Sequence, residues 1–444
     1  MINFFLIIIG KLLSLISTTL KLGNGSTWPG HIALTVNKNF IRDIIRINPH
    51  LKIILIAGTN GKTTTGKLIS TILEKSGYRA FQNESGANLL NGITSSLLLH
   101  SSILSTINYN YAIFEVDENT LPLALKELTP NFLILLNLFR DQLDRYGEVN
   151  TILDKWKRAL KKLTKETVLI LSADDPQIAY LGVQANTPGR WNRSYTRGFY
   201  FGLDDNALSQ TSQQHAVDST YCPKCNSKLT YINIYYSHLG NWICQKCLYK
   251  RPKLDLSTYG SYPLQGIYNR YNVHAAVLLT KIIGIKEKQI EESLKNFNPS
   301  FGRQEVINVK GKKVQIFLSK NPTSFNESLR TIASLNAKNV LFVLDDRIPD
   351  GRDVSWIWDV DFEDYVDELK NITVSGDRCY DMGLRIKYAI KSQKYNSKFK
   401  VFENLREAIK IAIDISHKNE MLYILPTYSA MLEVRKILTG KKIL

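Results

Sequence analysis

The chain has 444 residues, of which 44% are hydrophobic and 22% are charged, a balance that excludes a disordered or collagen-like protein and suits two or three globular domains. Its formal net charge of +17 favours an anionic partner, such as a nucleotide, a nucleic acid, a lipid phosphate or a membrane surface, without choosing among them. Five cysteines are too few for a disulfide framework, so the composition suits a reducing compartment.

The first twenty residues form an apolar segment that raises the question of a membrane. Ile2 to Ile9 is almost wholly apolar, but Lys11 and several hydroxyl residues interrupt the second half of the segment. A spanning helix needs about 20 predominantly apolar residues, and a secretory signal has basic residues before its apolar run. We therefore expect a helix that packs on the protein or lies on a membrane surface, with a true anchor or a cleaved signal as the alternatives.

A strand, a glycine loop and a helix come next, in the order that a phosphate-binding loop needs. Leu51 to Ala57 reads as a buried strand, Gly58 to Thr65 contains Gly-Lys-Thr, and apolar residues then recur at helical spacing. In such a loop Lys62 reaches the outer phosphates and the Thr63 hydroxyl can bind Mg²⁺. The standard loop has a glycine where this chain has Ile56, so the match is to a variant; the alternative is a chance glycine turn.

Further strands are predicted at 111–116, 132–136 and 167–171, a spacing typical of an α/β fold with a parallel sheet. The carboxyl ends of these strands should lie on the same edge as the phosphate loop. Glu115, near the end of the first of them, is therefore a candidate magnesium ligand. A helix cap or a solvated loop residue is the ordinary alternative for an acidic side chain there.

Two Cys-x-x-Cys pairs, Cys222 with Cys225 and Cys244 with Cys247, are separated by eighteen residues. This spacing is typical of a four-thiolate zinc ribbon, and a closed shell of four thiolates indicates a structural Zn²⁺ rather than a catalytic one. A redox pair of dithiols is the alternative. The fifth cysteine, Cys379, is predicted to be a packed thiol.

After the ribbon the α/β pattern resumes, with an apolar helix at 277–283 and strands at 314–318, 340–344 and 422–425. A domain boundary is predicted near residue 300. The predicted organisation is an N-terminal helix and loop at 1–50, an ATP-binding domain at 51–300 with the ribbon inserted at about 219–252, and a C-terminal α/β domain at 301–444.

Several of these motifs together resemble one family. The loop at 58–63 looks like the ATP loop of the Mur ligases and the related folylpolyglutamate synthases, and the run from Asn137 to Tyr146 resembles their segment after the third strand. The resemblance covers roughly 51–444 and implies a Mur ligase-like central ATPase domain followed by a Rossmann-like domain. It implies that ATP is bound by Thr59, Asn60, Gly61, Lys62, Thr63, Thr64, Asn269, Asn272 and Arg303.

Three departures narrow the resemblance. Mur ligases that act on nucleotide precursors carry a UDP-binding domain before the ATP loop, and Gly58 comes too early for one. The family has a histidine where this chain has Gln142, and a zinc ribbon is unusual for it. The early position of the loop, the inserted ribbon and the stretch 350–359 together resemble the amidating branch of the family, the synthetase subunits of lipid II isoglutaminyl synthases.

The resemblance implies an ATP-dependent ligase that forms a carbon–nitrogen bond in peptidoglycan biosynthesis. The D-glutamate α-carboxylate of the lipid II stem peptide would become D-isoglutamine through an acyl phosphate. The cofactors would be ATP, Mg²⁺ held by Thr63 and Glu115, and structural Zn²⁺. Ammonia would come from a separate GatD-type glutaminase subunit, and the protein would work in the cytoplasm or on the inner face of the membrane.

A Cys–His glutaminase needs a third group to orient its histidine. The resemblance implies that this chain lends that carboxylate across the subunit interface, and we expect Asp353 rather than Asp350 to supply it. Trp356 and Trp358 beside it are expected to anchor the interface. The alternative is that both carboxylates only cap or turn the loop, or that they meet the ATP ribose.

Two other functions remain open on the sequence alone. One is a Mur-type ligase that adds an amino acid to a carboxylate, as folylpolyglutamate synthases do. The other is an ATPase that uses its ribbon on nucleic acid through the aromatic residues Tyr221, Tyr231, Tyr235 and Trp242. We expect amidation and no nucleic-acid partner.

Overall fold

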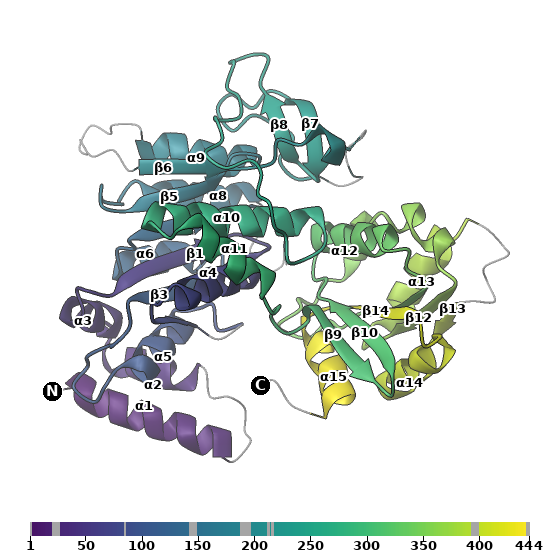
Figure 1. The fold of residues 1–444 in the computed structure, drawn as a ribbon, viewed down its shortest axis with the longest axis horizontal. Helices are drawn as coiled ribbons and strands as arrows, with labels where there is room; N and C mark the ends of the chain where they lie inside the picture. The colour runs from purple at the N-terminus through teal and green to yellow at the C-terminus, as the bar shows by residue number, and fades with distance from the viewer. Residues whose placement is uncertain are drawn as a thin grey trace.

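The computed structural model describes residues 2–19, 27–83, 86–141, 149–186, 197–210, 214, 217–391 and 399–440. Each of two six-stranded sheets is covered by helices, and a small two-stranded ribbon projects from the end of the first unit (Figure 1). The first unit is built from the chain up to α11, and the second begins with β9. The α/β class and the inserted ribbon predicted from the sequence are thus both present.

The first sheet is wholly parallel, with strand order β2-β3-β1-β4-β5-β6. Its strands are β1 (Lys52–Ala57), β2 (Ala80–Gln82), β3 (Tyr111–Val116), β4 (Phe132–Leu135), β5 (Val168–Ser172) and β6 (Arg197–Phe201). Because β1 lies between β3 and β4, the loops that follow these three strands meet at one edge of the sheet, where open α/β sheets bind ligands.

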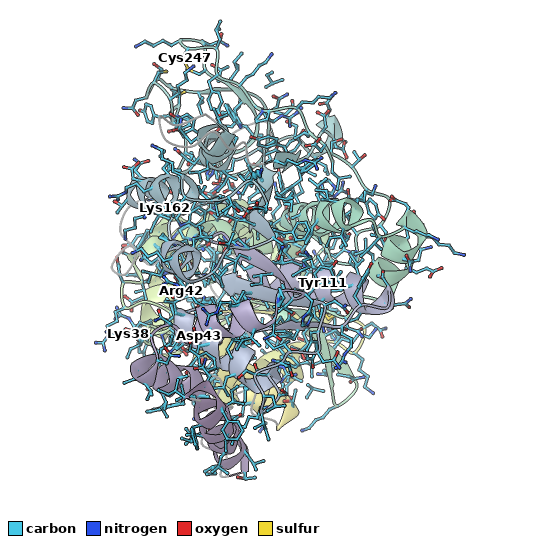
Figure 2. All side chains as sticks on the ribbon, turned by 90° about the vertical axis from the view of Figure 1, so that its left-hand side faces the viewer. Lys38, Arg42, Asp43, Tyr111, Lys162 and Cys247 are labelled. Atoms are coloured by element: carbon cyan, nitrogen blue, oxygen red, sulfur yellow. The ribbon has the colours of Figure 1, made fainter. Side chains whose placement is uncertain are left out.

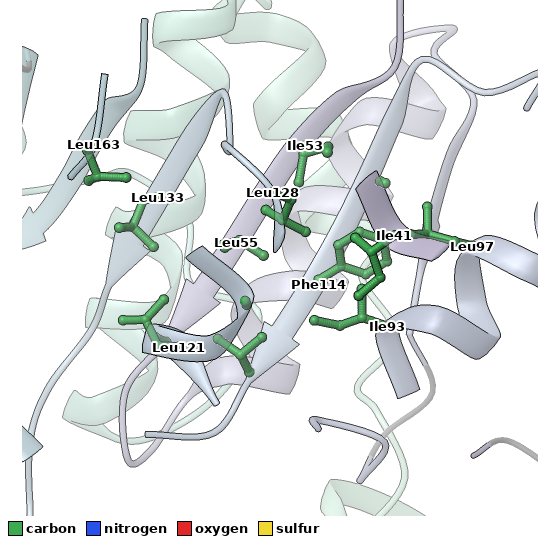
Figure 3. Packing of buried hydrophobic residues seen from close by; sticks show 14 of the residues in the cluster. Ile41, Ile53, Leu55, Ile93, Leu97, Phe114, Leu121, Leu128, Leu133 and Leu163 are labelled. Atoms are coloured by element: carbon green, nitrogen blue, oxygen red, sulfur yellow. The ribbon is translucent and has the colours of Figure 1, made fainter. Parts of the chain in front are cut away.

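Alternate residues of β1 supply the two hydrophobic cores on either side of this sheet. Ile53 and Leu55 face one core, drawn in Figure 3, and Ile54 and Ile56 face the other. The first core is covered by α1 (Ile2–Thr19), α2 (Trp28–Val36), α3 (Phe40–Ile47), α5 (Leu90–His100), α6 (Leu121–Glu127), α8 (Val149–Leu160) and α9 (Pro176–Asn186). The second is covered by α4 (Lys62–Lys75), α10 (Ile267–Ile283) and α11 (Glu287–Lys295).

The ribbon consists of β7 (Thr230–Tyr236) paired antiparallel with β8 (Leu239–Ile243), and it follows the short helix η1 (Asn206–Leu208). It is fastened to the first sheet by Trp242, which is fully buried and donates a hydrogen bond from Nε1 to the Ala173 carbonyl (3.1 Å) just after β5. The burial of this large aromatic ring, with its N–H hydrogen-bonded, holds the ribbon against the first sheet.

The second sheet has strand order β13-β12-β11-β14-β10-β9, and only the edge strand β9 runs antiparallel to its neighbour. Its strands are β9 (Arg303–Val309), β10 (Lys312–Phe317), β11 (Asn339–Val343), β12 (Asn371–Ser375), β13 (Phe399–Val401) and β14 (Met421–Pro426). The helices are α12 (Pro322–Ser334), α13 (Cys379–Ala389), α14 (Leu405–Ile415) and α15 (Tyr428–Thr439), with the short helices η2 (Ser355–Asp359), η3 (Phe362–Asp364) and η4 (Val366–Glu368).

The structure can be compared with two helices predicted from the sequence. The apolar helix predicted at 277–283 begins earlier, at Ile267, so that Asn269 and Asn272 lie within its first turns rather than before it. The first twenty residues do contain a helix, α1, but within the described ranges no helix is both long and apolar enough to cross a bilayer.

Candidate ATP and catalytic site

The loop between β1 and α4 has the backbone of a phosphate-binding turn. Gly58 and Gly61 adopt positive φ angles of 145° and 92°, which disfavour residues with a side chain. A Cβ atom on Gly61 would lie 2.2 Å from Oδ1 of Asn272, so only glycine fits against α10. Helix α4 begins at Lys62, and the predicted strand, loop and helix are therefore confirmed.

Lys62 is a buried cation at the start of this helix. Its Nζ lies over the loop, donates to the Gly58 carbonyl and to the Thr59 carbonyl (3.2 Å), and is 3.9 Å from the Glu118 carboxylate. A positive charge at a helix N-terminus that also presents backbone N–H groups suits a polyphosphate.

Thr63, Glu115 and Arg303 meet beside the loop although they come from three distant segments. The Thr63 hydroxyl donates to Oε2 of Glu115 (2.5 Å) and accepts a hydrogen bond from Nη2 of Arg303 (2.9 Å). A hydroxyl and a buried carboxylate are hard oxygen ligands of the kind Mg²⁺ prefers, so these residues fit the predicted ion. Nε of Arg303 is buried with no partner among the described residues, and burial lowers the pKa of this guanidinium; both features suit an anionic ligand.

The predicted ATP-binding residues line two adjoining cavities. The first has a volume of about 620 Å³, counting space open to solvent, and its walls include the apolar or aromatic Tyr236, Leu264, Tyr268 and Phe317. Six of the predicted residues line it: Asn60, Gly61, Thr64, Asn269, Asn272 and Arg303. The remaining three, Thr59, Lys62 and Thr63, line the second together with Glu115. One cavity thus suits a nucleoside and the other suits phosphates.

Asn269 and Asn272 are both buried, and Nδ2 of Asn272 donates a hydrogen bond to Oδ1 of Asn269 (3.0 Å). Oδ1 of Asn272 also accepts a hydrogen bond from the Thr65 hydroxyl (3.4 Å). Asn272 therefore supports the back of the phosphate loop, a position that the sequence pattern alone did not indicate.

Lys320 and Asn321, which the sequence analysis missed, bring the second unit onto the loop. Asn321 exchanges side-chain hydrogen bonds with Asn60 (3.2 and 3.4 Å), and Nζ of Lys320 forms an ion pair with buried Asp141. Burial raises the pKa of the Asp141 carboxyl. Burial alone would lower the pKa of Lys320, but the nearby carboxylates of Asp141 and Glu118 have a larger effect, and the pKa of the lysine is raised. One feature of the sequence could have indicated them: both residues lie between a predicted strand and Pro322, and proline is common at the first position of a helix.

Asp350 and Asp353 are close in sequence but differ in environment. Asp350 is buried and accepts a hydrogen bond from the Ser429 N–H (2.8 Å) at the start of α15, and burial raises the pKa of its carboxyl. Asp353 is exposed, accepts from the Ser355 N–H (2.8 Å), and has its pKa lowered by hydrogen bonds from Ser355. Of the two carboxylates, Asp353 is the one on the exposed surface, where a partner protein could reach it. Both also line a further cavity that contains Lys320 and Asp141.

An apolar surface lies near Asp353. Trp358 is 48% exposed and its ring is 6.1 Å from that of Tyr388, which is 71% exposed. Tyr380, Leu384 and Tyr388 recur every four residues on α13 and are all exposed, so they form one row. Trp356, by contrast, is half-buried and packs against Phe325.

The four ribbon cysteines converge as their spacing predicted. Their Sγ atoms all lie within 4.8 Å of one another, with 3.6 Å between Cys222 and Cys247 and 3.4 Å between Cys225 and Cys244. A tetrahedral zinc with Zn–S bonds of about 2.3 Å requires sulfur separations of about 3.8 Å, so the set fits Zn²⁺. Cys379 lies apart in the core of the second unit.

Two of the ribbon aromatics proposed for base stacking, Tyr235 and Trp242, are fully buried and cannot stack on bases.

The run from Asn137 to Tyr146 is described only in part. Gln142, which stands where the family has a histidine, belongs to 142–148 and lies outside the described residues, as does the end of the run. Asn137, at the start of that run, accepts from the Asn60 N–H (2.9 Å) and so shapes the phosphate loop.

Comparison with known families finds two matches along the chain. Residues 56–280 match the Mur ligase middle domain, and residues 318–431 match the MurT ligase C-terminal family. The first match contains the phosphate loop, Glu115 and the asparagines of α10, and the second contains Lys320, Asp350 and Asp353.

Curated relatives cover most of the chain. A protein of Staphylococcus aureus strain COL, named lipid II isoglutaminyl synthase (glutamine-hydrolyzing) subunit MurT, is 32% identical over 383 residues, which span 82% of this chain and 83% of the relative. The protein of the same name from Streptococcus pneumoniae strain R6 is 31% identical in an alignment of 444 positions that covers 95% of this chain and 94% of the relative.

Solved structures share the fold at lower identity. A pseudomurein peptide ligase type C from Methanothermus fervidus is 21% identical with a TM-score of 0.64, covering 90% of this chain and 81% of its own. A MurF ligase from Thermotoga maritima in complex with ADP is 14% identical with a TM-score of 0.60, covering 91% and 83%.

Proposed function

Because the chain belongs to the Mur ligase family, within its MurT branch, we propose that it is the ATP-dependent synthetase subunit of a lipid II isoglutaminyl synthase in peptidoglycan synthesis. The observation that carries this proposal is the pair of cavities around the phosphate loop, in a chain that resembles MurT proteins along most of its length. The ADP bound to a MurF ligase of the same fold supports the nucleotide assignment.

The proposed reaction has two steps. An oxygen of the D-glutamate α-carboxylate attacks the γ-phosphorus of ATP, and ADP leaves, so that an acyl phosphate forms. Ammonia then attacks the acyl carbon, loses a proton, and expels inorganic phosphate, which leaves the amide of D-isoglutamine. Both steps concentrate negative charge on phosphoryl oxygens and therefore need fixed positive charges nearby.

The residues around the loop can supply those charges. Lys62, at the N-terminus of α4, would bind the outer phosphates, and Arg303 would face the same phosphates or the ribose from the second unit. Thr63 and Glu115 would hold Mg²⁺, which when bound neutralises phosphate charge. Glu115 is held in place through its backbone N–H, which donates to Oδ1 of Asn83 (2.9 Å).

Ammonia is the reactive nucleophile, yet it is mostly protonated at neutral pH. We propose that a GatD-type glutaminase subunit generates it and that Asp353 completes the glutaminase triad. The exposure of Asp353, and the exposed row of Tyr380, Leu384 and Tyr388 with Trp358 nearby, support an interface on this side of the second unit. The cytoplasm, with its ATP and reduced thiols, is the compartment that this reaction requires.

The direct test is to incubate the purified chain with lipid II, ATP and ammonium and to weigh the product. Amidation lowers the mass of each stem peptide by the difference between a carboxylic acid and an amide, and ADP appears in equal amount. A product enlarged by an amino acid would instead identify an amino-acid ligase. An unchanged lipid II would contradict the proposal.

A further inference from the structure

Helix α1 has two apolar faces, and the described residues of the chain cover only one of them. Leu6 and Ile7 are buried, and Gly10 lies so close to α5 that a Cβ atom there would be 2.6 Å from the Leu98 side chain. The outward residues are also large and apolar and follow helical spacing: Ile2, Phe5, Ile9 and Leu12 recur every three or four positions, and Leu15 and Ile16 lie one turn further on. Each is between 41% and 62% exposed. A helix that only completed a protein core would carry polar residues there.

We propose that this outward face, which we call the α1 face, seats the protein on the surface of a lipid bilayer that carries anionic headgroups. The α1 face comprises the six outward residues of α1. Contiguous exposed apolar surface of this kind usually marks an interaction site.

The covered side of α1 fixes how such a contact is made. Because Leu6, Ile7 and Gly10 are committed to the protein core, α1 cannot leave the fold to cross the membrane without exposing that core. It can only lie flat, with its outward residues among the headgroups and upper acyl chains, as interfacial helices do. Trp28, 69% exposed at the start of α2, which packs against α1, is of the residue type enriched at that depth.

The charges around the α1 face favour an anionic lipid surface over a neutral or basic partner. Residues 1–50 contain five Lys or Arg and a single acidic residue, Asp43. The Asp43 carboxylate accepts hydrogen bonds from the amides of Asn3 (3.3 Å) and Asn37 (3.0 Å). Lys38 and Asp43 lie at the α1 end of the molecule, far from Cys247 of the ribbon (Figure 2), whereas Arg42 is already paired with the Glu127 carboxylate (3.2 Å). Basic residues beside an apolar helix add electrostatic attraction to such a membrane.

Helix α5 links the α1 face to the catalytic cavity. Asn88 and Leu89, just before α5, line the cavity that contains Lys62, Thr63 and Glu115, whereas Leu98 of the same helix meets Gly10 of α1. The nine residue steps from Leu89 to Leu98 span about 14 Å at 1.5 Å per residue. A membrane-seated α1 would therefore hold the cavity within reach of the headgroup of a lipid-linked substrate; this last step rests on the proposed function, whereas membrane binding itself does not.

The test is sedimentation of the full chain with vesicles of phosphatidylcholine mixed with phosphatidylglycerol, without ATP or lipid II. Wild type should sediment with them. Phe5→Ser/Leu12→Ser/Leu15→Ser should weaken this binding by about tenfold or more, because less apolar surface enters the bilayer. The matched control, Ile232→Ser/Leu248→Ser on the ribbon, replaces residues of similar exposure at the far end and should bind like wild type. Circular dichroism melting checks that each variant is folded.

A second pair of substitutions removes basic side chains near the α1 face and tests whether the protein prefers anionic lipid. Lys38→Gln/Arg46→Gln should weaken binding to the mixed vesicles by about fivefold per residue, and have little effect on pure phosphatidylcholine. Wild type that stays in solution with both kinds of vesicle, or a folded triple-serine variant that binds as tightly as wild type, overturns the proposal. A wild-type dimer that the triple variant converts to monomer, with no vesicle binding, would identify the α1 face as a contact between two copies and would also overturn it.

A second readout separates this inference from the proposed function. The triple-serine variant should amidate lipid II in vesicles more slowly than wild type, yet amidate a water-soluble analogue with a shortened lipid at the wild-type rate. If wild type amidates neither substrate but still binds vesicles, the proposed function fails and the membrane surface stands.

Discussion

Lys320, three residues after β10, forms an ion pair with Asp141, which lies beyond the end of β4 and is buried. This contact joins the second unit to the first next to the phosphate loop. Two charges at such a junction stabilise it only as a pair, because either one alone is a partly desolvated charge without a counter-ion.

We predict that Lys320→Met will destabilise the protein by about 2 kcal/mol, less than a fully buried pair would lose because Lys320 keeps some solvent exposure. Lys320→Met/Asp141→Leu should recover part of this loss, since no unpaired charge remains. Urea unfolding of the two single variants and the double variant measures the coupling. Lys281→Met, which breaks the exposed pair with Glu287, is the control and should change stability little. Additive effects of the two site substitutions would contradict this account.

Much of the fold and part of the site could be predicted, because the sequence patterns that indicate them each lie within a short stretch of the chain. The phosphate loop at 58–65 and the four ribbon cysteines are short patterns whose geometry follows from their own spacing. The Lys320–Asp141 pair could not be predicted, since it joins residues 179 positions apart and neither has a local signature. Asp350 and Asp353 look equivalent in sequence, and only the packing of α15 against Asp350 separates a buried capping residue from an exposed one.

A second prediction concerns the phosphate loop. Lys62→Ala should lower ATP turnover and amidation by about a hundredfold or more, because it removes a fixed charge from the phosphates while leaving the fold intact. Release of ADP in the presence of lipid II and ammonium measures this. Lys75→Ala, at the exposed end of the same helix, is the matched control. Equal turnover by both variants would remove Lys62 from the ATP site.

A third prediction separates the two carboxylates of the loop after β11. Asp353→Asn should abolish amidation with glutamine and spare amidation with ammonium, because in the proposed complex only the glutaminase uses this carboxylate. Asp350→Asn should instead lower the melting temperature, because it alters the buried acceptor at the start of α15. Loss of both activities in a folded Asp353→Asn variant would place Asp353 in the ATP site, and loss of neither would make it structural.

A fourth prediction concerns the metal. Elemental analysis of protein purified without chelator should find one zinc per chain, held by Cys222, Cys225, Cys244 and Cys247. Cys244→Ser should lose the zinc and reduce solubility or stability, because metal binding and ribbon folding are coupled. Cys379→Ser, which alters a cysteine outside the cluster, should keep the zinc. Zinc-free wild type that is fully folded would contradict the structural role.

A fifth prediction follows from His274, which lies within α10 and hydrogen-bonds to the Tyr262 hydroxyl and the Gly202 carbonyl (2.8 Å each). Burial lowers the pKa of His274 to about 4 from its ordinary 6.5, so the unfolded chain binds a proton first as the pH falls. Stability should therefore decrease between pH 6.5 and 4, by about 3 kcal/mol from this residue.

The same pH range contains an opposing group. Burial raises the pKa of Asp174 to about 6, so its protonation favours the folded state as the pH falls. The measurement is therefore the difference in unfolding free energy between wild type and His274→Gln from pH 7 to 4. That difference should shrink towards acid pH, since the variant lacks the group that titrates; a constant difference would show that His274 does not carry the dependence.

The central claim is that the substrate carboxylate is activated as an acyl phosphate at the loop around Lys62. The most direct measurement uses lipid II in which both oxygens of the D-glutamate α-carboxylate are ¹⁸O, together with ATP and ammonium. Attack of that carboxylate on the γ-phosphorus, followed by displacement with ammonia, must transfer one labelled oxygen to each inorganic phosphate released with the amide. Phosphate that carries ¹⁸O in step with amide formation is the predicted result. Amide formed with unlabelled phosphate would contradict it.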